Sequence, residues 1–335
     1  MAEAKLTKKD FATDQEVRWC PGCGDYAILA AVQATFADMG MERHKVAIVS
    51  GIGCASRFPY YMNTYGFHTV HGRAPAVATG LKITNPDLSV WIVSGDGDAL
   101  SIGGNHLIHL LRRNIDVNLM LFDNRIYGLT KGQYSPTSEM GKKTKSTPFG
   151  SVDRPFDPAT LALGAGATFV ARSIDVHAPH LKETLKQAHA HKGCSFVQIF
   201  QNCNIFNDGA FENIREKKLR DDHVIELKHG EPLIFGKERD KGIRWNNNQP
   251  EVVTLGNGIS ESDLIVHDEA GPIGYLMTLA AMRPPEFPMP LGVLRRIDAP
   301  TVDAGIHEQI EAVTEKKGAG KLEEIVYSGN IWTVD

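Results

Sequence analysis

The stretch VWIVSGDGDALSIGGNHLIHLLRRNIDVNLMLFDNRIYGLTKGQ, residues 90–133, decides the fold. An apolar run at 90–93 leads into Gly-Asp-Gly at 95–97, and a helix-like segment follows. A second apolar run at 115–122 then ends in Asp-Asn at 123–124. The order strand, helix, strand predicts two parallel neighbours in one sheet, because the helix returns the chain to the starting edge. Both polar turns are therefore expected at the carboxyl ends of the strands, where open α/β sheets bind ligands.

The same alternation continues on both sides of this stretch. Buried strands are predicted at 45–50, 166–171 and 195–200, and helices at 26–39, 74–84 and 177–191. A long loop is expected at 131–158, which is rich in Gly, Lys, Ser, Thr and Pro. We therefore expect an α/β fold with a doubly wound, mostly parallel sheet, which forms one cofactor-binding domain over residues 1–210.

The two ends of the chain differ from this pattern. Residues 1–17 are polar and are expected to form an arm or a sheet edge. After about residue 210 the sequence becomes dense in charge, with a hairpin predicted within 231–245, a short helix at 271–282 and an irregular, proline-rich segment at 283–290. We expect residues 211–335 to be an irregular C-terminal extension that covers a partner.

Composition places the chain among ordinary globular proteins. It has 335 residues, of which 42% are hydrophobic and 23% are charged. The formal net charge of −4 gives no electrostatic reason to expect nucleic acid or an anionic membrane surface as a partner. No apolar run reaches the ~18 residues of a membrane span, and the N-terminus lacks the apolar core of a secretory signal. We expect a cytoplasmic protein.

The two polar turns offer ligands for a magnesium ion. Asp96 can give a carboxylate oxygen, Asn124 an amide oxygen and Ile126 its backbone carbonyl. Mg²⁺ prefers octahedral oxygen coordination, which substrate phosphates and water usually complete. A helix that begins after the turn adds free N–H groups and a positive dipole end for a phosphate. The Gly-Asp-Gly turn alone is a weak signal, but the 25 residues at 98–122 bring both turns to one edge.

The five cysteines suggest a metal site, because a disulfide framework is not expected in such a chain. Cys20-x-x-Cys23 alone is compatible with zinc, with a redox pair or with an iron–sulfur cluster, although a zinc ribbon would want a second close pair. Cys54 and Cys203 each follow a predicted strand, whereas Cys194 precedes one. We therefore predict that Cys20, Cys23, Cys54 and Cys203 form the metal site and that Cys194 is a packed free thiol.

Histidines and lysines give weaker signals. His177, His180, His189 and His191 surround one predicted helix, and we interpret them as a solvated helix face rather than a metal site, since no acidic partner completes them. His71-Gly72-Arg73 precedes a helix near the cofactor edge, and we favour contact with a diphosphate over a structural role. The basic residues Lys142, Lys143 and Lys145 fit either a solvated run or a contact for an anionic substrate or coenzyme A.

Together these segments resemble a known family. The Gly-Asp-Gly turn followed one helix and one strand later by a polar pair resembles the thiamine diphosphate motif, with Asp123 in place of the first Asn. The segments WCPGCGD at 19–25, SGIGCASR at 50–57, HGRA at 71–74, GDGDALSIGGNH at 95–106, DNRIYGLTKGQYSPTS at 123–138, and Cys203 are similar to the β subunit of 2-oxoacid:ferredoxin oxidoreductases. The resemblance covers about residues 17–210, and the remainder matches only loosely.

The resemblance implies a site and a set of partners. Thiamine diphosphate would contact Ile52, Gly53, Cys54, Ala55, His71, Gly97, Asp98, Gly128 and Leu129. Magnesium would bind Asp96, Asn124 and the carbonyl of Ile126, and one [4Fe-4S] cluster would bind the four cysteines named above. A partner α subunit, in a heterodimer or a dimer of heterodimers, would supply the activating glutamate, so no catalytic residue can be named in this chain.

The implied reaction is oxidative decarboxylation of a 2-oxoacid with coenzyme A, which passes electrons through the cluster to ferredoxin and is reversible for CO₂ fixation. The loop at 126–138 looks most like the 2-oxoglutarate branch, and Lys131 is a possible contact for the distal carboxylate. Pyruvate or another 2-oxoacid is the alternative substrate. A non-redox thiamine decarboxylase or ligase with structural or zinc-bound cysteines is the alternative enzyme. A non-enzymatic iron–sulfur module is a third reading.

Overall fold

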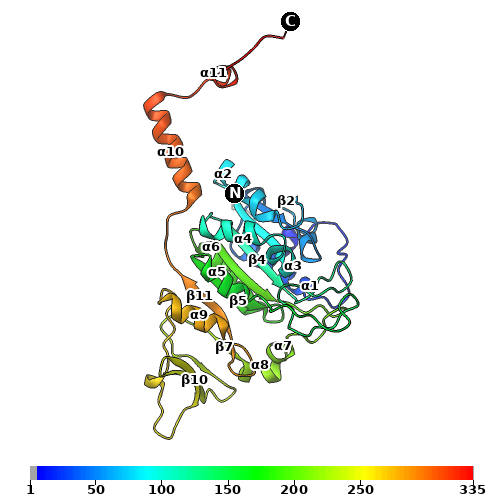
Figure 1. Cartoon of the computed structure of the whole chain (residues 1–335), viewed down its shortest axis with the longest axis vertical. Coiled ribbons are helices and arrows are strands. Elements are labelled where there is room, and N and C mark those ends of the chain that lie inside the picture. The colour runs from blue at the N-terminus through cyan, green and yellow to red at the C-terminus, as the bar shows by residue number, and fades with distance from the viewer. Residues whose placement is uncertain (1–5, 335) are drawn as a thin grey trace.

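The computed structural model describes residues 6–334 and is built around an eight-stranded sheet (Figure 1). The strands lie in the order β2-β1-β3-β4-β6-β5-β11-β7. Their bounds are β1 Val46–Ser50, β2 Tyr65–His68, β3 Ser89–Gly95, β4 Asn118–Asp123, β5 Phe169–Ile174, β6 Ser195–Phe200, β7 Val224–Glu226 and β11 Met289–Arg296. Within these residues every pairing of the sheet is parallel except that of β11 with β5. The predicted α/β class with a doubly wound, mostly parallel sheet is confirmed.

Helices cover both faces of the sheet. On one face lie α1 (Asp25–Asp38), α6 (Ala178–Ala190) and the 3₁₀ segment η3 (Ala55–Tyr61); on the other lie α2 (Ala74–Thr84), α4 (Gly104–Arg112), α5 (Pro158–Gly164) and α9 (Ile273–Ala281). Successive strand residues alternate between the two hydrophobic clusters: Trp91 and Val93 face the first layer, and Val90 and Ile92 the second. This is the period of two that a strand buried on both faces requires.

The Gly-Asp-Gly segment is not a turn that precedes a helix, as we expected, but the start of one. Helix α3 (Asp96–Leu100) begins directly after Gly95 and stops, and α4 begins at Gly104. The chain breaks because Gly103 donates its amide to the Asp98 carbonyl and lies against Gly72, where a Cβ on Gly103 would stand 2.4 Å from that carbonyl oxygen. Asp96 therefore occupies the first turn of a helix.

The described part of the expected arm or sheet edge, residues 6–17, is anchored by Phe11 at the end of η1 (Lys8–Phe11), which is fully buried against Phe36 with ring centroids 5.8 Å apart. Residues 1–5 lie outside the described residues. The histidines around α6 are not the solvated helix face that we predicted. His180 bonds Ser173, His191 bonds Thr168, and His189 stacks on Trp91, because the helix packs this side against the sheet.

The C-terminal third contributes to the main sheet and also extends beyond it. Strands β7 and β11 join the main sheet, while β8 (Ile234–Phe235), β9 (Lys241–Asn246) and β10 (Gln249–Thr254) form a second, three-stranded sheet that includes the predicted hairpin. The remaining elements are η2 (Arg43–Lys45), α7 (Glu212–Arg215), α8 (Lys217–His223), η4 (Glu261–Asp263), α10 (Val302–Lys317) and α11 (Leu322–Val326). The domain boundary near residue 210 stays a prediction. Among the described residues no helix is long and apolar enough to cross a membrane.

Candidate functional site

The two polar segments meet at the carboxyl edge of the sheet, because β3 and β4 are parallel neighbours with Gly95 beside Phe122. Asp96 is 2% exposed and accepts hydrogen bonds from the hydroxyls of Ser135 (2.5 Å) and Thr137 (2.6 Å). Burial and the nearby Asp123 carboxylate raise the pKa of Asp96 to about 7. A cation bound beside this carboxylate would favour its charged form.

The Thr137 hydroxyl lies between two buried carboxylates. Its Oγ1 stands 2.6 Å from Asp96 and 2.9 Å from Asp123, yet a hydroxyl has one proton to donate. Burial also raises the pKa of Asp123, which the Arg125 guanidinium opposes. The opposite oxygen of Asp123 accepts from Gln198 at 2.7 Å. Two buried acids that share one donor form an electron-rich site, which suits a divalent cation such as Mg²⁺.

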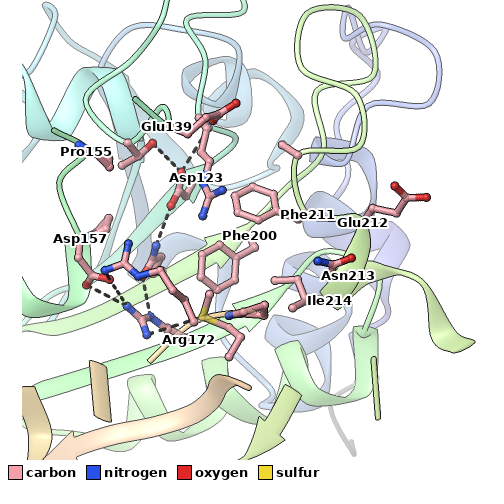
Figure 2. A pocket seen from close by; sticks show the side chains of 18 of the residues that line it. Asp123, Glu139, Pro155, Asp157, Arg172, Phe200, Phe211, Glu212, Asn213 and Ile214 are labelled. Carbon is pink, nitrogen blue, oxygen red and sulfur yellow. Dashed lines mark hydrogen bonds and ion pairs between the residues drawn. The ribbon is translucent and has the colours of Figure 1, made fainter. Parts of the chain in front are cut away.

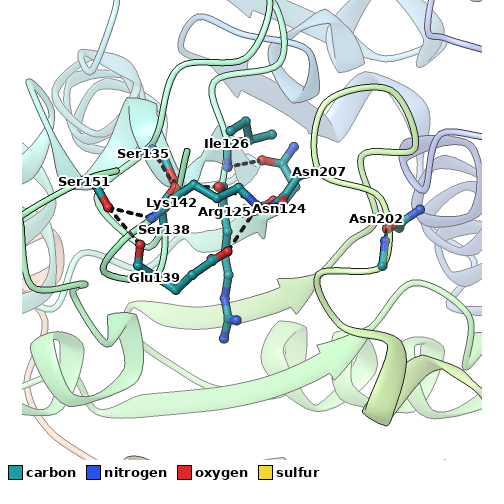
Figure 3. A network of polar contacts seen from close by, with 11 residues as sticks. Asn124, Arg125, Ile126, Ser135, Ser138, Glu139, Lys142, Ser151, Asn202 and Asn207 are labelled. Carbon is teal, nitrogen blue, oxygen red and sulfur yellow. Dashed lines mark hydrogen bonds and ion pairs between the residues drawn. The ribbon is translucent and has the colours of Figure 1, made fainter. Parts of the chain in front are cut away.

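Two loops, which carry Ser138 and Asn207, and a contact within the segment itself hold the segment after β4 in place (Figure 3). The side-chain oxygen of Asn124 accepts from the amide of Ile126 at 3.1 Å, and the Asn124 carbonyl accepts from Asn207 at 2.9 Å. Ser138 donates to the carbonyl of Arg125 at 2.6 Å. Contacts within the chain therefore fix the backbone of residues 124–126.

Asp98 joins three loops that the sequence assigned to the cofactor. Its Oδ1 accepts from the amides of Ile52 (3.0 Å) and Gly72 (2.7 Å) and from His71 Nδ1 (2.5 Å), and its Oδ2 accepts from Ser94 (2.5 Å). The side chain is fully buried. This carboxylate therefore sets the position of the glycine turn after β1 and of the loop before α2.

Glycine is required where the loop after β4 crosses the first turn of α3. A Cβ on Gly97 would stand 2.2 Å from a ring carbon of Tyr127, whose hydroxyl donates to the Gly97 carbonyl at 2.9 Å. Gly128 is the next residue. A Cβ added to Gly128 would lie 3.4 Å from Cys54 Sγ and 3.7 Å from Cys203 Sγ. The segment 127–128 thus connects the Asp96 site to two thiols.

The segment 19–24 brings the other two predicted cysteines to the same place. Trp19 donates to the Cys54 carbonyl at 2.6 Å, the Gly24 amide bonds the Asn202 carbonyl, and Cys23 Sγ lies 3.2 Å from Gln201 Nε2. Burial raises the pKa of both Cys23 and Cys54, and the other cysteines add to the rise: Cys54 and Cys203 at Cys23, and Cys203 and Cys20 at Cys54.

The thiols do not resemble a reactive redox pair. Burial and the nearby Asp25 carboxylate raise the pKa of Cys54 to about 12, whereas reactive cysteines have lowered pKa values. Thiolates would form here beside a cationic metal core, which deprotonates its thiol ligands. Within residues 6–334 no three His, Cys, Asp or Glu side chains are arranged to hold a single metal ion. Cys194 is fully buried at the start of β6, on the opposite edge.

Two cavities open beside these residues. One of about 430 Å³ is lined by the predicted contacts Ile52, Gly53 and Leu129 and by Arg18 and Arg57. The other, of about 470 Å³, lies on the far side of Asp123, where Asp157 and the buried Arg172 face Phe200 and Phe211 (Figure 2). We relate the first cavity to the cofactor, because Ile52 and Gly53 of the glycine turn after β1 line it and do not line the second.

Comparison with known proteins identifies the family. Residues 51–199 match the thiamine pyrophosphate enzyme, C-terminal TPP binding domain. The chain is 50% identical over 331 residues to the 2-oxoglutarate oxidoreductase subunit KorB of Mycobacterium tuberculosis, covering 98% of this chain and 88% of that protein. It is 47% identical over 215 residues to the 2-oxoacid:ferredoxin oxidoreductase 1 subunit beta of Aeropyrum pernix, covering 63% of this chain and 68% of that one. The chain belongs to the family of 2-oxoacid:ferredoxin oxidoreductase β subunits.

A solved member of this oxidoreductase family has the same fold throughout. The structure of 2-oxoglutarate:ferredoxin oxidoreductase from Magnetococcus marinus, with 2-oxoglutarate, coenzyme A and succinyl-CoA bound, superposes with a TM-score of 0.77 at 34% identity and covers 97% of each chain. The C-terminal third is therefore included in the likeness, as it is for the mycobacterial relative. The thiamine family model itself ends at residue 199.

Some residues of this β-subunit site were not found from the sequence. Ser135 and Thr137 donate hydrogen bonds to Asp96. The only sequence pattern that could have indicated them is the cluster of hydroxyl residues in the glycine-rich loop. Gln198 binds Asp123, and the signal was a polar residue in the middle of a buried strand. The sequence predicts that Asp98 contacts the cofactor. It does not reveal that Asp98 joins several loops, because that role depends on long-range contacts such as the one with Ile52, 46 residues away.

Proposed function

We propose that this chain is the β subunit of a 2-oxoglutarate:ferredoxin oxidoreductase that binds thiamine diphosphate, Mg²⁺ and one [4Fe-4S] cluster. The reaction would join 2-oxoglutarate and coenzyme A into succinyl-CoA with release of CO₂ and a proton, while electrons leave singly to ferredoxin; it is reversible in principle. The observation that carries this proposal is the segment 127–128, which contacts the Gly97 turn on one side and lies between Cys54 and Cys203 on the other.

The cofactor site follows from the contacts around Asp96. The buried carboxylate, the amide oxygen of Asn124 and the carbonyl of Ile126 would hold Mg²⁺ and, through it, the diphosphate. Ile52, Gly53, Cys54, Ala55, His71, Gly97, Asp98, Gly128 and Leu129 would surround the cofactor. Thiamine diphosphate supplies the carbanion chemistry that decarboxylates a 2-oxoacid. The chain's part is to fix the loops that orient it, and Asp98 supports this role by binding Ile52, His71 and Gly72.

The cluster would be held by Cys20, Cys23, Cys54 and Cys203, since iron–sulfur clusters take cysteine thiolates as ligands. Cys54 belongs to the same turn as Ile52 and Gly53, so a cluster there would adjoin the cofactor. Trp19 fixes the carbonyl of Cys54 and thereby ties the segment 19–24 to this turn. Such adjacency suits the transfer of single electrons from the cofactor to ferredoxin.

An anionic substrate is supported by the charges around the first cavity. Arg18, Arg57 and His68 line it, whereas Glu16 is the acidic residue among its lining side chains and pairs with Arg18 at 2.8 Å. Lys131 is exposed, and its amide binds the Gly128 carbonyl at 3.0 Å, which fixes its backbone beside the thiols. We propose that Lys131 pairs with the distal carboxylate of 2-oxoglutarate, which pyruvate lacks.

An α subunit is expected at the cofactor edge. The loop at 139–156 exposes large apolar side chains there: Met140 is 57%, Phe149 97% and Val152 86% exposed. Large exposed apolar groups near one another mark protein interfaces. The α subunit would cover this loop and bring the activating acid to the cofactor.

The test is an anaerobic viologen-reduction assay of the co-expressed α and β chains over a panel of 2-oxoacids. We expect reduction that depends on coenzyme A and is fastest with 2-oxoglutarate. Lys131→Ala should lower the preference for 2-oxoglutarate over pyruvate, and an unchanged preference would remove Lys131 from the account. Asp96→Ala should lose thiamine diphosphate and keep the iron.

The main alternative is a non-redox thiamine enzyme with structural or zinc-bound cysteines. No observation favours it over the redox enzyme, although the raised pKa of Cys54 is compatible with any metal that takes thiolates. Zinc without iron in protein purified without oxygen would support this alternative.

A further inference from the structure

The main sheet contains a buried arginine that contacts several elements of the fold (Figure 2). Arg172 lies on β5 and is 1% exposed. Its Nη2 donates to the carboxylate of Asp157 at 2.9 and 3.0 Å, its Nη1 to the carbonyl of Ala280 at 2.8 Å, and its Nε to Oε1 of Gln198 at 2.9 Å. Each nitrogen of the guanidinium therefore has an acceptor, and these contacts fix its position.

Stability alone does not explain an arginine at this position. Val170 and Ile174, two places away on the same face of β5, are apolar and fully buried. Removing a guanidinium and a carboxylate from water costs much of what their attraction gains, so apolar residues often stabilise such a site equally well. The Arg172–Asp157 pair therefore indicates a role beyond holding the sheet together.

Arg172 is one end of a row of hydrogen bonds that reaches the candidate magnesium site. The neighbouring strands β5, β6 and β4 carry Arg172, Gln198 and Asp123. Nε2 of Gln198 donates to Oδ2 of Asp123 at 2.7 Å. The Thr137 hydroxyl then lies 2.9 Å from Oδ1 of Asp123 and 2.6 Å from Oδ2 of Asp96. All five residues are at most 4% exposed, so bulk water does not replace the contacts within the row.

The arginine determines the direction of these hydrogen bonds. A guanidinium can only donate, and a carboxylate can only accept. Gln198 lies between one of each, so a single orientation of its amide satisfies both neighbours, with the oxygen toward Arg172 and the nitrogen toward Asp123. Without Arg172 the amide could turn over and present its oxygen to Asp123.

This direction decides where the one proton of the Thr137 hydroxyl goes. Oδ2 of Asp123 accepts from Gln198, and Oδ1 accepts from the Arg125 amide at 3.3 Å. Both oxygens of Asp123 therefore have a donor without Thr137. The Thr137 proton is free for Asp96, whose oxygen is also the nearer of the two at 2.6 Å. If Gln198 did not donate, Asp123 would compete for that proton.

From these contacts we propose that Arg172 is a positioning residue for the magnesium site. Acting through Gln198, it directs the proton of Thr137 to Asp96 and so holds that carboxylate in the orientation that a metal ion requires. The inference rests on the proposed function, in which Asp96 is a ligand of Mg²⁺. Hydrogen-bond donors behind a ligating carboxylate are part of a metal site, and removing them typically weakens metal binding by about 10- to 100-fold.

The experiment measures how much magnesium the co-expressed α and β complex needs in order to retain thiamine diphosphate. The complex is freed of magnesium with EDTA and titrated with MgCl₂ at a fixed concentration of thiamine diphosphate, and the bound cofactor is measured after gel filtration. Gln198→Met, which keeps the size of the side chain and removes the donor, should raise the half-saturating magnesium concentration by roughly tenfold. Arg172→Met should raise it by roughly threefold, because Gln198 remains but can turn over.

The wild-type complex separates a failure of this inference from a failure of the proposed function. If the wild type retains no thiamine diphosphate at any magnesium concentration, the proposed function is wrong and the inference falls with it. If the wild type depends on magnesium and Gln198→Met has the same half-saturating concentration, only the positioning role is wrong. Gln198→Met keeps the Arg172–Asp157 pair, so the test holds even where Arg172→Met does not fold.

A combination of variants shows whether the effect passes through Thr137. In a Thr137→Val chain the proton in question is absent, so adding Gln198→Met should change the half-saturating magnesium concentration by less than about twofold. A general disturbance of the sheet would instead have its full effect in both backgrounds, and that result overturns the proposal. Arg172→Met together with Gln198→Met should likewise equal Gln198→Met alone, because Arg172 acts through Gln198.

Arg296→Met is the matched control. Arg296 belongs to β11, pairs with Glu269 at 3.0 Å and lies beside Phe169 at the start of β5. Its loss should lower the melting temperature of the complex and leave the half-saturating magnesium concentration unchanged. A rise in this concentration as large as that of Gln198→Met would show that any damage to the sheet weakens the magnesium site, and would overturn the positioning role.

Discussion

The carboxylate of Asp98 provides the most specific prediction about how the cofactor loops are held. It is buried and accepts four hydrogen bonds, two of them from the amides of Ile52 and Gly72. Asp98→Ala leaves both amides without a partner, and an unpaired buried donor costs about 1–3 kcal/mol. We therefore expect the free energy of unfolding to fall by about 4 kcal/mol, a large part of the 5–15 kcal/mol typical of a folded domain.

Asp98→Asn separates the geometry from the charge. The amide oxygen can still accept from the two backbone amides and from His71, so the variant is expected to lose only about 1–2 kcal/mol, from the bond that Ser94 donates to Oδ2 and from the loss of the charge. Urea unfolding of the isolated chain, followed by tryptophan fluorescence, measures both values. Asp87→Ala, which removes an exposed carboxylate before β3, is the control and should change stability by less than about 0.5 kcal/mol.

The same variants should affect the cofactor in the same order. Since Asp98 sets the position of the turn after β1 and of the loop before α2, Asp98→Ala complexes should retain little thiamine diphosphate and Asp98→Asn complexes more. If Asp98→Ala lowers the free energy of unfolding by less than about 1 kcal/mol and retains the cofactor normally, the role given to this carboxylate is refuted.

Three further predictions concern the thiols, the glycine crossing and pH. Cys203→Ser should lose iron while Cys194→Ser keeps it, as measured by iron analysis after anaerobic purification; the reverse would show that the wrong cysteine was chosen. Gly97→Ala should abolish cofactor retention, because its Cβ would stand 2.2 Å from the Tyr127 ring. Tyr127→Phe serves as the comparison, and normal retention of the cofactor by Gly97→Ala would contradict this prediction. Burial lowers the pKa of His180 from 6.5 to about 4, so the unfolded chain binds the proton first and stability should rise with pH between these values. His180→Gln should reduce the difference in unfolding free energy between pH 4 and pH 7, measured by urea unfolding, by at most about 3 kcal/mol. An unchanged difference would contradict the role given to His180.

Local patterns in the sequence carry most of the fold. The apolar runs predicted as strands at 45–50 and 195–200 form β1 and β6, and the segment of small residues predicted as a helix at 74–84 forms α2. The short helix α3 was not predicted, since its end depends on the close approach of Gly103 to Gly72, which no local pattern reports.

The candidate site was predictable where the predicted ligands follow strands directly. Asp96 and Asn124 could be placed from the ends of β3 and β4, and Cys54 and Cys203 from positions after β1 and β6. Ser135, Thr137 and Gln198 could not, because they reach the site from a long loop and from the next strand of the sheet. The histidines of α6 were misread, because His180 and His191 turn toward the sheet despite their polar spacing.

The central claim is that the thiamine site and a cluster of the four cysteines adjoin one another through the segment 127–128. It is tested most directly by recording the visible and electron paramagnetic resonance spectra of the anaerobic α and β complex before and after addition of 2-oxoglutarate and coenzyme A. The account predicts a brown protein whose visible absorbance bleaches and whose reduced-cluster signal appears only when both substrates are present. A colourless complex that contains zinc and no iron, or a cluster that stays oxidised while 2-oxoglutarate is decarboxylated, would contradict it.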